Sequence, residues 1–281
     1  MDIENNVEKL IDDFKDELNH IESSFSKFIF KTQQNKTEEI RHQIKIAEWY
    51  VRGTIYHCKN LIKHYKKICE NVEIRALGTM NASGQPPEVI LMYSPEILFL
   101  YYEFYSLVNL ARISLDNLRY ILSPVFSTPF NQLPKSITRF LNGETNCPIY
   151  QDLKKADIVK YLIDIRDCLT HYRSFASSDN VMAVLEGSET PQIEWSLSLA
   201  RLSYRFPDIS KVVVNIYLPD AIFTYNHKSH VRGKMAIFTY TQKYNILSQS
   251  MQFVKFITSI TSSSILLLEK EIRPIYTYEP R

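Results

Sequence analysis

Glycine is scarce in this sequence, and the motifs that depend on glycine are missing from it. Only 6 of the 281 residues are glycine. Neither a Gly-x-x-x-x-Gly-Lys phosphate loop nor a Gly-x-Ser-x-Gly nucleophile elbow occurs. The sequence therefore excludes the classical P-loop NTPases and the α/β-hydrolases, and so few glycines argue against a many-turned β-sandwich.

Cysteine and histidine are too scattered to predict a metal site. The four cysteines form no Cys-x-x-Cys pair, and the only close histidine pair, His227 and His230, falls in a segment that we expect to be a loop. A structural zinc ion takes four ligands, usually His or Cys. We therefore predict neither a metal nor a cofactor, and we interpret the cysteines as reduced, buried thiols. They are Cys58, Cys69, Cys147 and Cys168.

Long apolar runs and a surplus of one charge are also missing. No run reaches the roughly 18 uninterrupted apolar residues of a membrane-spanning helix, and residues 1–8 do not resemble a signal peptide. The 33 lysines and arginines nearly balance the 31 aspartates and glutamates, so the net charge of +2 does not by itself identify a nucleic-acid-binding protein. We expect a globular, cytoplasmic protein that does not associate with a membrane.

Two long helices are predicted at the amino-terminal end. Apolar residues from Val7 to Phe28 recur at steps of three and four. In the next segment the steps alternate without a miss, a period of about 3.5 that is typical of a coiled-coil seam. The seam consists of Ile40, Ile44, Ala47, Val51, Thr54, Cys58, Leu61, Tyr65, Ile68 and Val72. We expect an antiparallel hairpin, domain 1–77, although the seam is equally suited to a second protomer.

The remainder, 88–281, is predicted to be a helical bundle with a small β insertion before its last helix. The turn-forming segment 78–87 is interpreted as a linker. A helix is expected to begin at Pro95 and to end at Ser123–Pro124. Further helices are predicted near 136–141, from Leu153 through Leu169, and from 247 to 268. The fold class is therefore mainly α.

Period-two patterns predict the β insertion, at 180–240. They cover 181–185, 193–199 and 212–218. The letters Ala-Ile-Phe-Thr-Tyr occur twice, at 221–225 and 236–240. Fifteen residues is too short a period for a solenoid, so we interpret the repeat as a pair of strands or as a coincidence.

A basic run on the second predicted helix is a candidate RNA-binding face. Lys59, Lys63 and Lys66 follow at steps of four and three and share a helix face away from the seam. Such a stripe can track a phosphate backbone. The alternative is a solvated face that balances acidic residues of the same helix.

The pattern Arg-x(4)-His occurs twice, at Arg166–His171 and at Arg52–His57. In the first copy Asp167 lies four residues before His171, about 40° around a helix axis, where a carboxylate can orient the imidazole. Arg166 and His171 are about 140° apart, so a regular helix would not direct both at one atom unless the turn loosens or the arginine side chain curls round the helix. The polar segment from Thr170 to Ser178 permits such loosening. The second copy has Gly53 at the position of the polar partner, and it lies inside the unbroken seam of the second predicted helix. We therefore favour 166–171 as the site.

Ile165-Arg-Asp-Cys-Leu-Thr-His-Tyr172 resembles the motif of the HEPN superfamily of ribonucleases and toxins. The aromatic-rich segment 99–109 also resembles an early core helix of such bundles, and the resemblance covers about 94–175. Asp167 departs from the Asn that is usual in the family. The amino-terminal hairpin and the β insertion have no counterpart in the resemblance.

The resemblance implies metal-independent RNA cleavage at a cleft between two subunits, in a protein of toxin–antitoxin, abortive-infection or antiviral defence type. Arg166 would then neutralise the scissile phosphate, His171 would transfer the proton, and Asp167 would position His171. Tyr172 and Arg173 would contact bases or backbone. An antitoxin or regulatory protein is an implied partner besides RNA and a second copy of the chain.

Two alternatives remain open from the sequence. The residues of the 166–171 segment are equally explained by surface ion pairs and by a histidine that ends a helix as a favourable cation. The chain as a whole is alternatively a non-catalytic helical module whose seam binds another protein.

Overall fold

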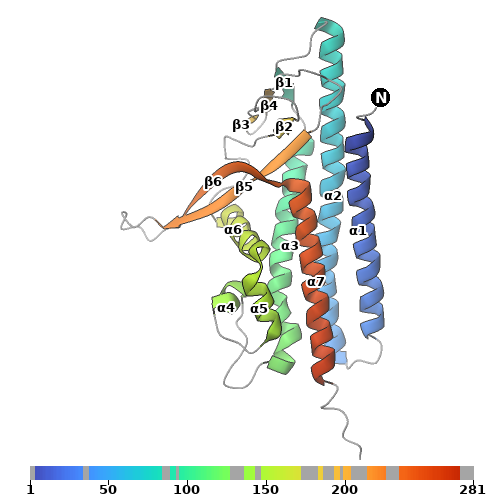
Figure 1. Ribbon diagram of the computed structural model, residues 1–281, viewed down its shortest axis with the longest axis vertical. Coiled ribbons are helices and arrows are strands. Elements are labelled where there is room, and N and C mark those ends of the chain that lie inside the picture. The colour runs from blue at the N-terminus through green and yellow to red at the C-terminus, as the bar shows by residue number, and fades with distance from the viewer. Residues whose placement is uncertain are drawn as a thin grey trace, which may run out of the picture. The chain divides into compact units, whose positions relative to one another are not determined.

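The protein is mainly α-helical, and the prediction of its fold class is confirmed in a computed structural model (Figure 1). The structure describes residues 4–33, 38–83, 89–92, 95–126, 136–142, 147–171, 183–185, 193–196, 199–203, 214–225 and 234–272. In these ranges the helices are α1 (Glu4–Gln33), α2 (Glu38–Ser83), α3 (Pro95–Phe126), α4 (Ile137–Asn142), α5 (Pro148–Lys155), α6 (Asp157–His171) and α7 (Ile246–Ile272). The strands are β1 (Val89–Met92), β2 (Ala183–Leu185), β3 (Ile193–Ser196), β4 (Leu199–Ser203), β5 (Val214–Tyr225) and β6 (Lys234–Asn245).

The chain divides into two compact units, and the long helices run through both. The first unit comprises Met1–Glu17, His57–Ser106 and Asp164–Met251. The second comprises Leu18–Tyr56, Leu107–Ile163 and Gln252–Arg281. The division predicted from the sequence, into 1–77 and 88–281, follows the chain instead and stays a prediction.

The seam of α2 is buried within a single chain. From Ile44 to Ile68 every seam residue is at most 5% exposed, and Leu61 and Ile44 are fully buried. In the second unit α2 contacts α1, where Arg52 Nη2 donates a hydrogen bond to Ser26 Oγ at 3.1 Å. The seam from Ile44 to Ile68 is therefore covered by the chain itself, and the protein-binding alternative stays a prediction.

The second unit packs α2 closely against α3. A Cβ atom on Gly53 would lie 2.8 Å from Leu110 Cδ1, so the glycine allows the two helices to approach at this point. Its core includes Leu18, Phe25, Ile29, Val51, Ala111, Leu115, Tyr150, Leu153, Val159, Leu162, Phe253, Val254, Ile257 and Ile265. The Tyr161 and Phe253 rings stack with centroids 6.1 Å apart and join α6 to α7. The described part of this unit is a helical bundle.

Three helix boundaries differ from the prediction. α2 continues to Ser83, through six residues that were expected to be linker, because one glycine costs a helix only about 1 kcal/mol and its neighbours include good helix formers. α3 begins at Pro95 as predicted but passes Pro124 and ends at Phe126. The helix predicted from Leu153 is instead two helices, since Ala156 is extended at φ −83° and ψ 108° and ends α5. α4 lies where it was predicted.

The strands of the first unit form two small antiparallel sheets. Their orders are β1-β4-β3 and β2-β5-β6. The two Ala-Ile-Phe-Thr-Tyr segments pair with each other, with Ile222 opposite Ile237 and Ala221 opposite Phe238, which confirms the paired-strand interpretation. β1 was not predicted; it pairs with β4, whose residues are more than a hundred positions away.

The last helix, α7, follows β6 directly. Asn245 Oδ1 accepts hydrogen bonds from the backbone N–H groups of Leu247 at 2.9 Å and Ser248 at 3.3 Å, an N-terminal cap. Within the described residues, one helical stretch, Ile246–Leu268, is long and apolar enough to cross a membrane, and half of its most apolar window is buried in the protein. A core helix of a bundle has the same length and composition.

Candidate functional site

The Arg-x(4)-His segment at 166–171 lies at the carboxyl-terminal end of α6. Asp157 begins this helix, where a carboxylate interacts favourably with the helix dipole. One face of α6 is buried, with Val159, Leu162 and Ile165 at most 1% exposed. Burial of this face fixes the rotation of the helix and leaves the side chains of Arg166 and Asp167 half-buried at the protein surface.

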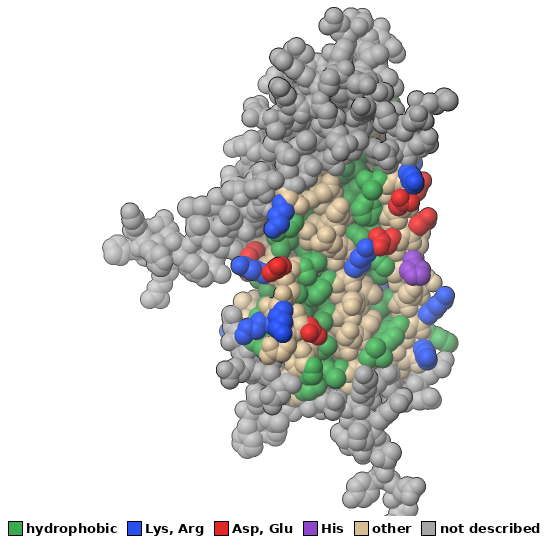
Figure 2. All heavy atoms as spheres, in the orientation of Figure 1, with side chains coloured by type: hydrophobic (Ala, Val, Ile, Leu, Met, Phe, Trp, Pro, Cys, Tyr) green, Lys and Arg blue, Asp and Glu red, His purple; other side chains and the backbone are tan. Residues whose placement is uncertain are grey.

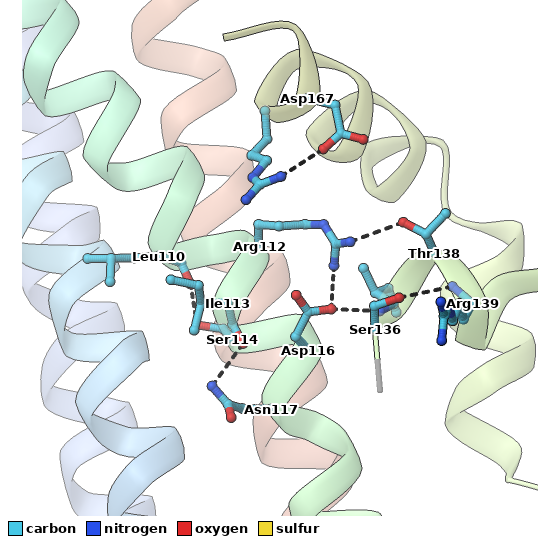
Figure 3. Close-up of polar contacts among 12 residues, drawn as sticks. Leu110, Arg112, Ile113, Ser114, Asp116, Asn117, Ser136, Thr138, Arg139 and Asp167 are labelled. Carbon is cyan, nitrogen blue, oxygen red and sulfur yellow. Dashed lines mark hydrogen bonds and ion pairs between the residues drawn. The ribbon is translucent and has the colours of Figure 1, made fainter. Parts of the chain in front are cut away.

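Arg166 and Asp167 form an ion pair. Arg166 Nη1 donates to Asp167 Oδ1 at 3.0 Å, with side chains 30% and 27% exposed. In Figure 3 a dashed line marks this ion pair at the labelled Asp167 carboxylate. The carboxylate that we expected to orient His171 thus binds the neighbouring arginine, where it fixes the guanidinium and offsets part of its charge.

Of the two ways left open for Arg166 and His171 to reach one atom, loosening of the helix before His171 does not occur. α6 is α-helical from Asp157 through His171. A regular helix keeps residues five positions apart about 140° around its axis and about 7.5 Å along it. One copy of α6 therefore does not present Arg166 and His171 on the same face. The side chain of His171 and the residues Tyr172 and Arg173 lie outside the described part of the chain.

The second Arg-x(4)-His match is part of the bundle. Arg52 contacts Glu48 Oε1 at 2.7 Å and Ser26 Oγ of α1 at 3.1 Å. His57 Nδ1 instead lies 2.5 Å from Glu103 Oε2 of α3. The two side chains are therefore directed to different helices.

His57, Glu103 and Asn60 form a polar contact between α2 and α3 in the first unit. Asn60 Nδ2 donates to the second carboxylate oxygen of Glu103, Oε1, at 3.4 Å. The side chains of His57 and Glu103 are 24% and 21% exposed, which strengthens the pairing relative to one in open solvent. The sequence carried no signal for this contact because 46 residues separate His57 from Glu103.

His64 lies two turns beyond His57, against the Phe99 ring. The ring centroids are 5.4 Å apart. Desolvation by burial lowers the pKa of His64, and Lys67 and Lys63 lower it further, while Glu103 and Glu96 act in the opposite direction. The lowered pKa favours the neutral imidazole, so His64 is a poor candidate for a cationic RNA contact at neutral pH.

The three lysines of the basic run lie in the first unit, on α2. Lys63 is exposed, whereas Lys59 and Lys66 are half-buried. Lys66 Nζ is 3.9 Å from Glu70 Oε1, and its neighbour Lys67 is 4.0 Å from Glu96 Oε1. The run is thus partly neutralised by acidic residues, and Lys63 keeps the most solvent-accessible charge.

A buried arginine on α3 joins the second unit's short helix α4 to the bundle. Arg112, 6% exposed, donates to Asp116 Oδ1 at 2.6 Å and to Thr138 Oγ1 at 3.0 Å. The same Asp116 oxygen accepts the backbone N–H of Ile137 at 2.6 Å, which caps α4 (Figure 3). The sequence analysis did not identify this network; Arg112 and Asp116 at i and i+4 on a predicted helix were its only sequence signal.

The thiols described in the structure, those of Cys58, Cys69 and Cys147, are in no disulfide. Burial raises the pKa of Cys58 to about 12 and also raises that of Cys147, where hydrogen bonds from the backbone act in the opposite direction. Both side chains are 1% exposed. Such thiols are poor nucleophiles and poor metal ligands at neutral pH.

No cluster of three or more His, Cys, Asp or Glu side chains suited to a metal ion occurs within the described ranges. The pair His227 and His230 lies outside them. On the face shown in Figure 2, Lys and Arg side chains are interspersed with Asp and Glu. This mixture agrees with the net charge of +2.

No family model matches the chain, and no curated protein or solved structure is significantly similar to it. The interpretation of the site therefore depends on the chemistry of its own residues.

Proposed function

We propose that the protein is a metal-independent endoribonuclease of HEPN type that acts as a homodimer, with Arg166 and His171 as its catalytic residues. The observation that carries the proposal is the Arg166 side chain, 30% exposed at the end of α6, with Nη1 held 3.0 Å from Asp167 Oδ1. A fixed guanidinium at the surface suits the binding of a phosphodiester, because its N–H groups match phosphate oxygens in pairs.

The continuous helix favours a site composed from two subunits. Residues 166 and 171 occupy positions about 140° apart around the axis of one helix. A second copy of α6 at the dimer interface would supply a second Arg166 and a second His171, so that groups on different faces of the two helices could reach one phosphate together. Transfer of a 2′-hydroxyl proton and protonation of the leaving oxygen need a base and an acid, and two histidines supply both.

In this mechanism Arg166 neutralises the phosphate and the charge that develops on it. One His171 accepts the 2′-hydroxyl proton as that oxygen attacks phosphorus, and the other donates a proton to the departing 5′ oxygen. Asp167 is a positioning residue for Arg166. Tyr172, Arg173, Lys59, Lys63 and Lys66 are proposed contacts to RNA. Defence or toxin biology, and a partner antitoxin, belong to the same proposal through the family resemblance alone.

The proposal is tested by RNA cleavage in EDTA. The wild-type protein is expected to degrade a labelled single-stranded transcript under these conditions, and Arg166→Ala and His171→Ala are expected to lose at least about a hundredfold in rate. His57→Ala is the matched control, because His57 ends the other Arg-x(4)-His pattern and is expected to leave cleavage unchanged. Equal rates for wild type and His171→Ala would refute the proposal.

A further inference from the structure

The outward face of α2 in the second unit carries exposed aromatic side chains interleaved with basic ones. Trp49 is 75% exposed and Tyr56 is 60% exposed. The Arg52 side chain between them is 42% exposed, and Lys45 and His42 are exposed as well. We name these five residues the outer stripe of α2.

The stripe follows the helix period. Its members are three, four, three and four residues apart, and at about 100° per residue they fall within an arc of about 80°. That arc is on the side of α2 opposite to the buried seam. It extends about 21 Å along the axis, from His42 to Tyr56.

A tryptophan ring has a large apolar surface, and burying that surface stabilises a protein. The Trp49 ring, which is mostly exposed, does not contribute this stabilisation. Trp49 does not contribute to the core, which is formed by the buried seam residues on the opposite face of α2. The ring therefore suits a partner outside this chain.

Arg52 is preorganised within the stripe. Its Nε lies 2.7 Å from Glu48 Oε1 and its Nη2 lies 3.1 Å from Ser26 Oγ. Along the helix axis, residue 52 is about 4.5 Å from Trp49 and about 6 Å from Tyr56. Two acidic residues border the stripe, Glu48 in its pair with Arg52 and Glu38 at the first residue of α2.

We propose that the outer stripe of α2 binds single-stranded RNA, with bases stacked on Trp49 and Tyr56 and phosphates paired with Arg52, Lys45 and His42. Aromatic platforms interleaved with cations are the combination by which proteins bind single strands without sequence preference. A helical protein partner would need aliphatic residues at these spacings in place of Lys45 and Arg52. The inference deepens the proposed function, since it names single-stranded RNA as the substrate form and relies on that function for the choice of RNA over DNA.

Trp49 itself reports the binding. The sequence has two tryptophans, Trp49 and Trp195, so Trp195→Phe leaves Trp49 as the only one. His171→Ala is added to prevent cleavage. Titration with a twelve-residue oligouridylate is expected to quench the Trp49 fluorescence, while heparin, a polyanion without bases, is expected to leave it nearly unchanged.

The affinity is measured by anisotropy of the labelled oligouridylate. Trp49→Ala and Tyr56→Ala are each expected to raise Kd about tenfold, the effect of losing one stacked base, and Trp49→Phe is expected to restore most of the affinity. Phe30→Ala is the matched control, because Phe30 is a ring on α1 exposed to 71%. Circular dichroism verifies that each variant is folded.

Each outcome separates this inference from the proposed function. Cleavage without quenching, or equal quenching by heparin, overturns the stripe as an RNA site. Quenching that is lost in Trp49→Ala supports the stripe even if no RNA is cleaved, a result that overturns the nuclease only. Self-association in sedimentation that Trp49→Ala abolishes, without RNA binding, overturns the stripe in favour of a protein-docking face.

Discussion

His57 Nδ1 on α2 lies 2.5 Å from Glu103 Oε2 on α3, and Asn60, one turn further along α2, donates to the other oxygen of the same carboxylate. Both oxygens of Glu103 are thus bound by one helix. This contact explains His57 as a residue that joins two helices of the bundle, and it assigns a structural role to the second Arg-x(4)-His pattern.

The contribution of this contact is measured by a double-mutant cycle. We expect His57→Ala and Glu103→Ala each to lower the free energy of unfolding by about 1–2 kcal/mol, with a coupling of about 1 kcal/mol, because the pair is half-buried and charge-assisted. Urea unfolding followed by circular dichroism provides the values. His42→Ala, exposed on the same helix, is the control and should change stability by less than about 0.5 kcal/mol. A coupling of zero would show that the two side chains act independently.

The close approach of α2 and α3 at Gly53 predicts a dependence on side-chain size. Gly53→Ala gains about 1 kcal/mol of helix propensity, which offsets the displacement of Leu110 Cδ1, the flexible end of a side chain. We expect a change below about 1 kcal/mol in thermal or urea unfolding. Gly53→Leu is expected to destabilise the protein by about 2–3 kcal/mol, because a larger side chain forces the helices apart. Equal stability of the alanine and leucine variants would contradict this packing.

Because the pKa of His64 is lowered, the folded protein is expected to lose stability in mild acid. Its pKa is lowered in the folded protein, first by burial against Phe99. As the pH falls through the unfolded value of about 6.5, the unfolded chain binds a proton that the folded protein does not, so the free energy of unfolding decreases. Glu103, Glu96, Lys67 and Lys63 are the charged groups that act on it.

The measurement compares urea unfolding at pH 7.5 and pH 5.5. Wild type is expected to lose more stability between these values than His64→Gln, which has no proton to bind at this position. A steeper loss in the variant would contradict the sign of the shift. His42→Gln, an exposed histidine on the same helix, is the control for general effects of acid.

Removing the negative charge of Asp167 is expected to raise the affinity of the protein for RNA. Its carboxylate fixes Arg166 but also repels phosphate. Asp167→Asn keeps an oxygen that accepts from Arg166 Nη1 and removes the negative charge, so we expect RNA affinity to rise about two- to fivefold at low salt. Asp167→Ala removes both effects and should lower the cleavage rate relative to Asp167→Asn. Affinity is measured by anisotropy in the His171→Ala background, and weaker binding by Asp167→Asn would contradict this role.

The helices with strong periodicity could be predicted from the sequence, and the contacts between distant segments could not. The seam from Ile44 to Ile68 identified α2 because one buried face imposes a 3.5-residue period. The break at Ala156 was missed because alanine favours helix, and only the tertiary context makes it extended. β1 was missed because its partner, β4, lies more than a hundred residues away.

The candidate site shows the same limit. The identities of Arg166 and Asp167 and their location on a helix were predicted, since they follow from a local pattern. The contact of Asp167 with Arg166 was not predicted. A carboxylate at position 167 can reach either Arg166 or His171, and the side-chain rotamers in the folded helix decide between them. The contact of His57 with Glu103 depends on the packing of two helices, which no local pattern encodes.

The most direct test of the proposed mechanism is the activity of a dimer with one altered subunit. Wild-type and His171→Ala chains with different affinity tags are co-expressed, and the mixed dimer is purified on both tags. If one site needs the histidines of both subunits, the mixed dimer cleaves RNA no faster than the His171→Ala homodimer. Cleavage at about half the wild-type rate, as for two independent sites in a symmetric dimer, would contradict the composite site. Full activity in a strictly monomeric protein would contradict it as well.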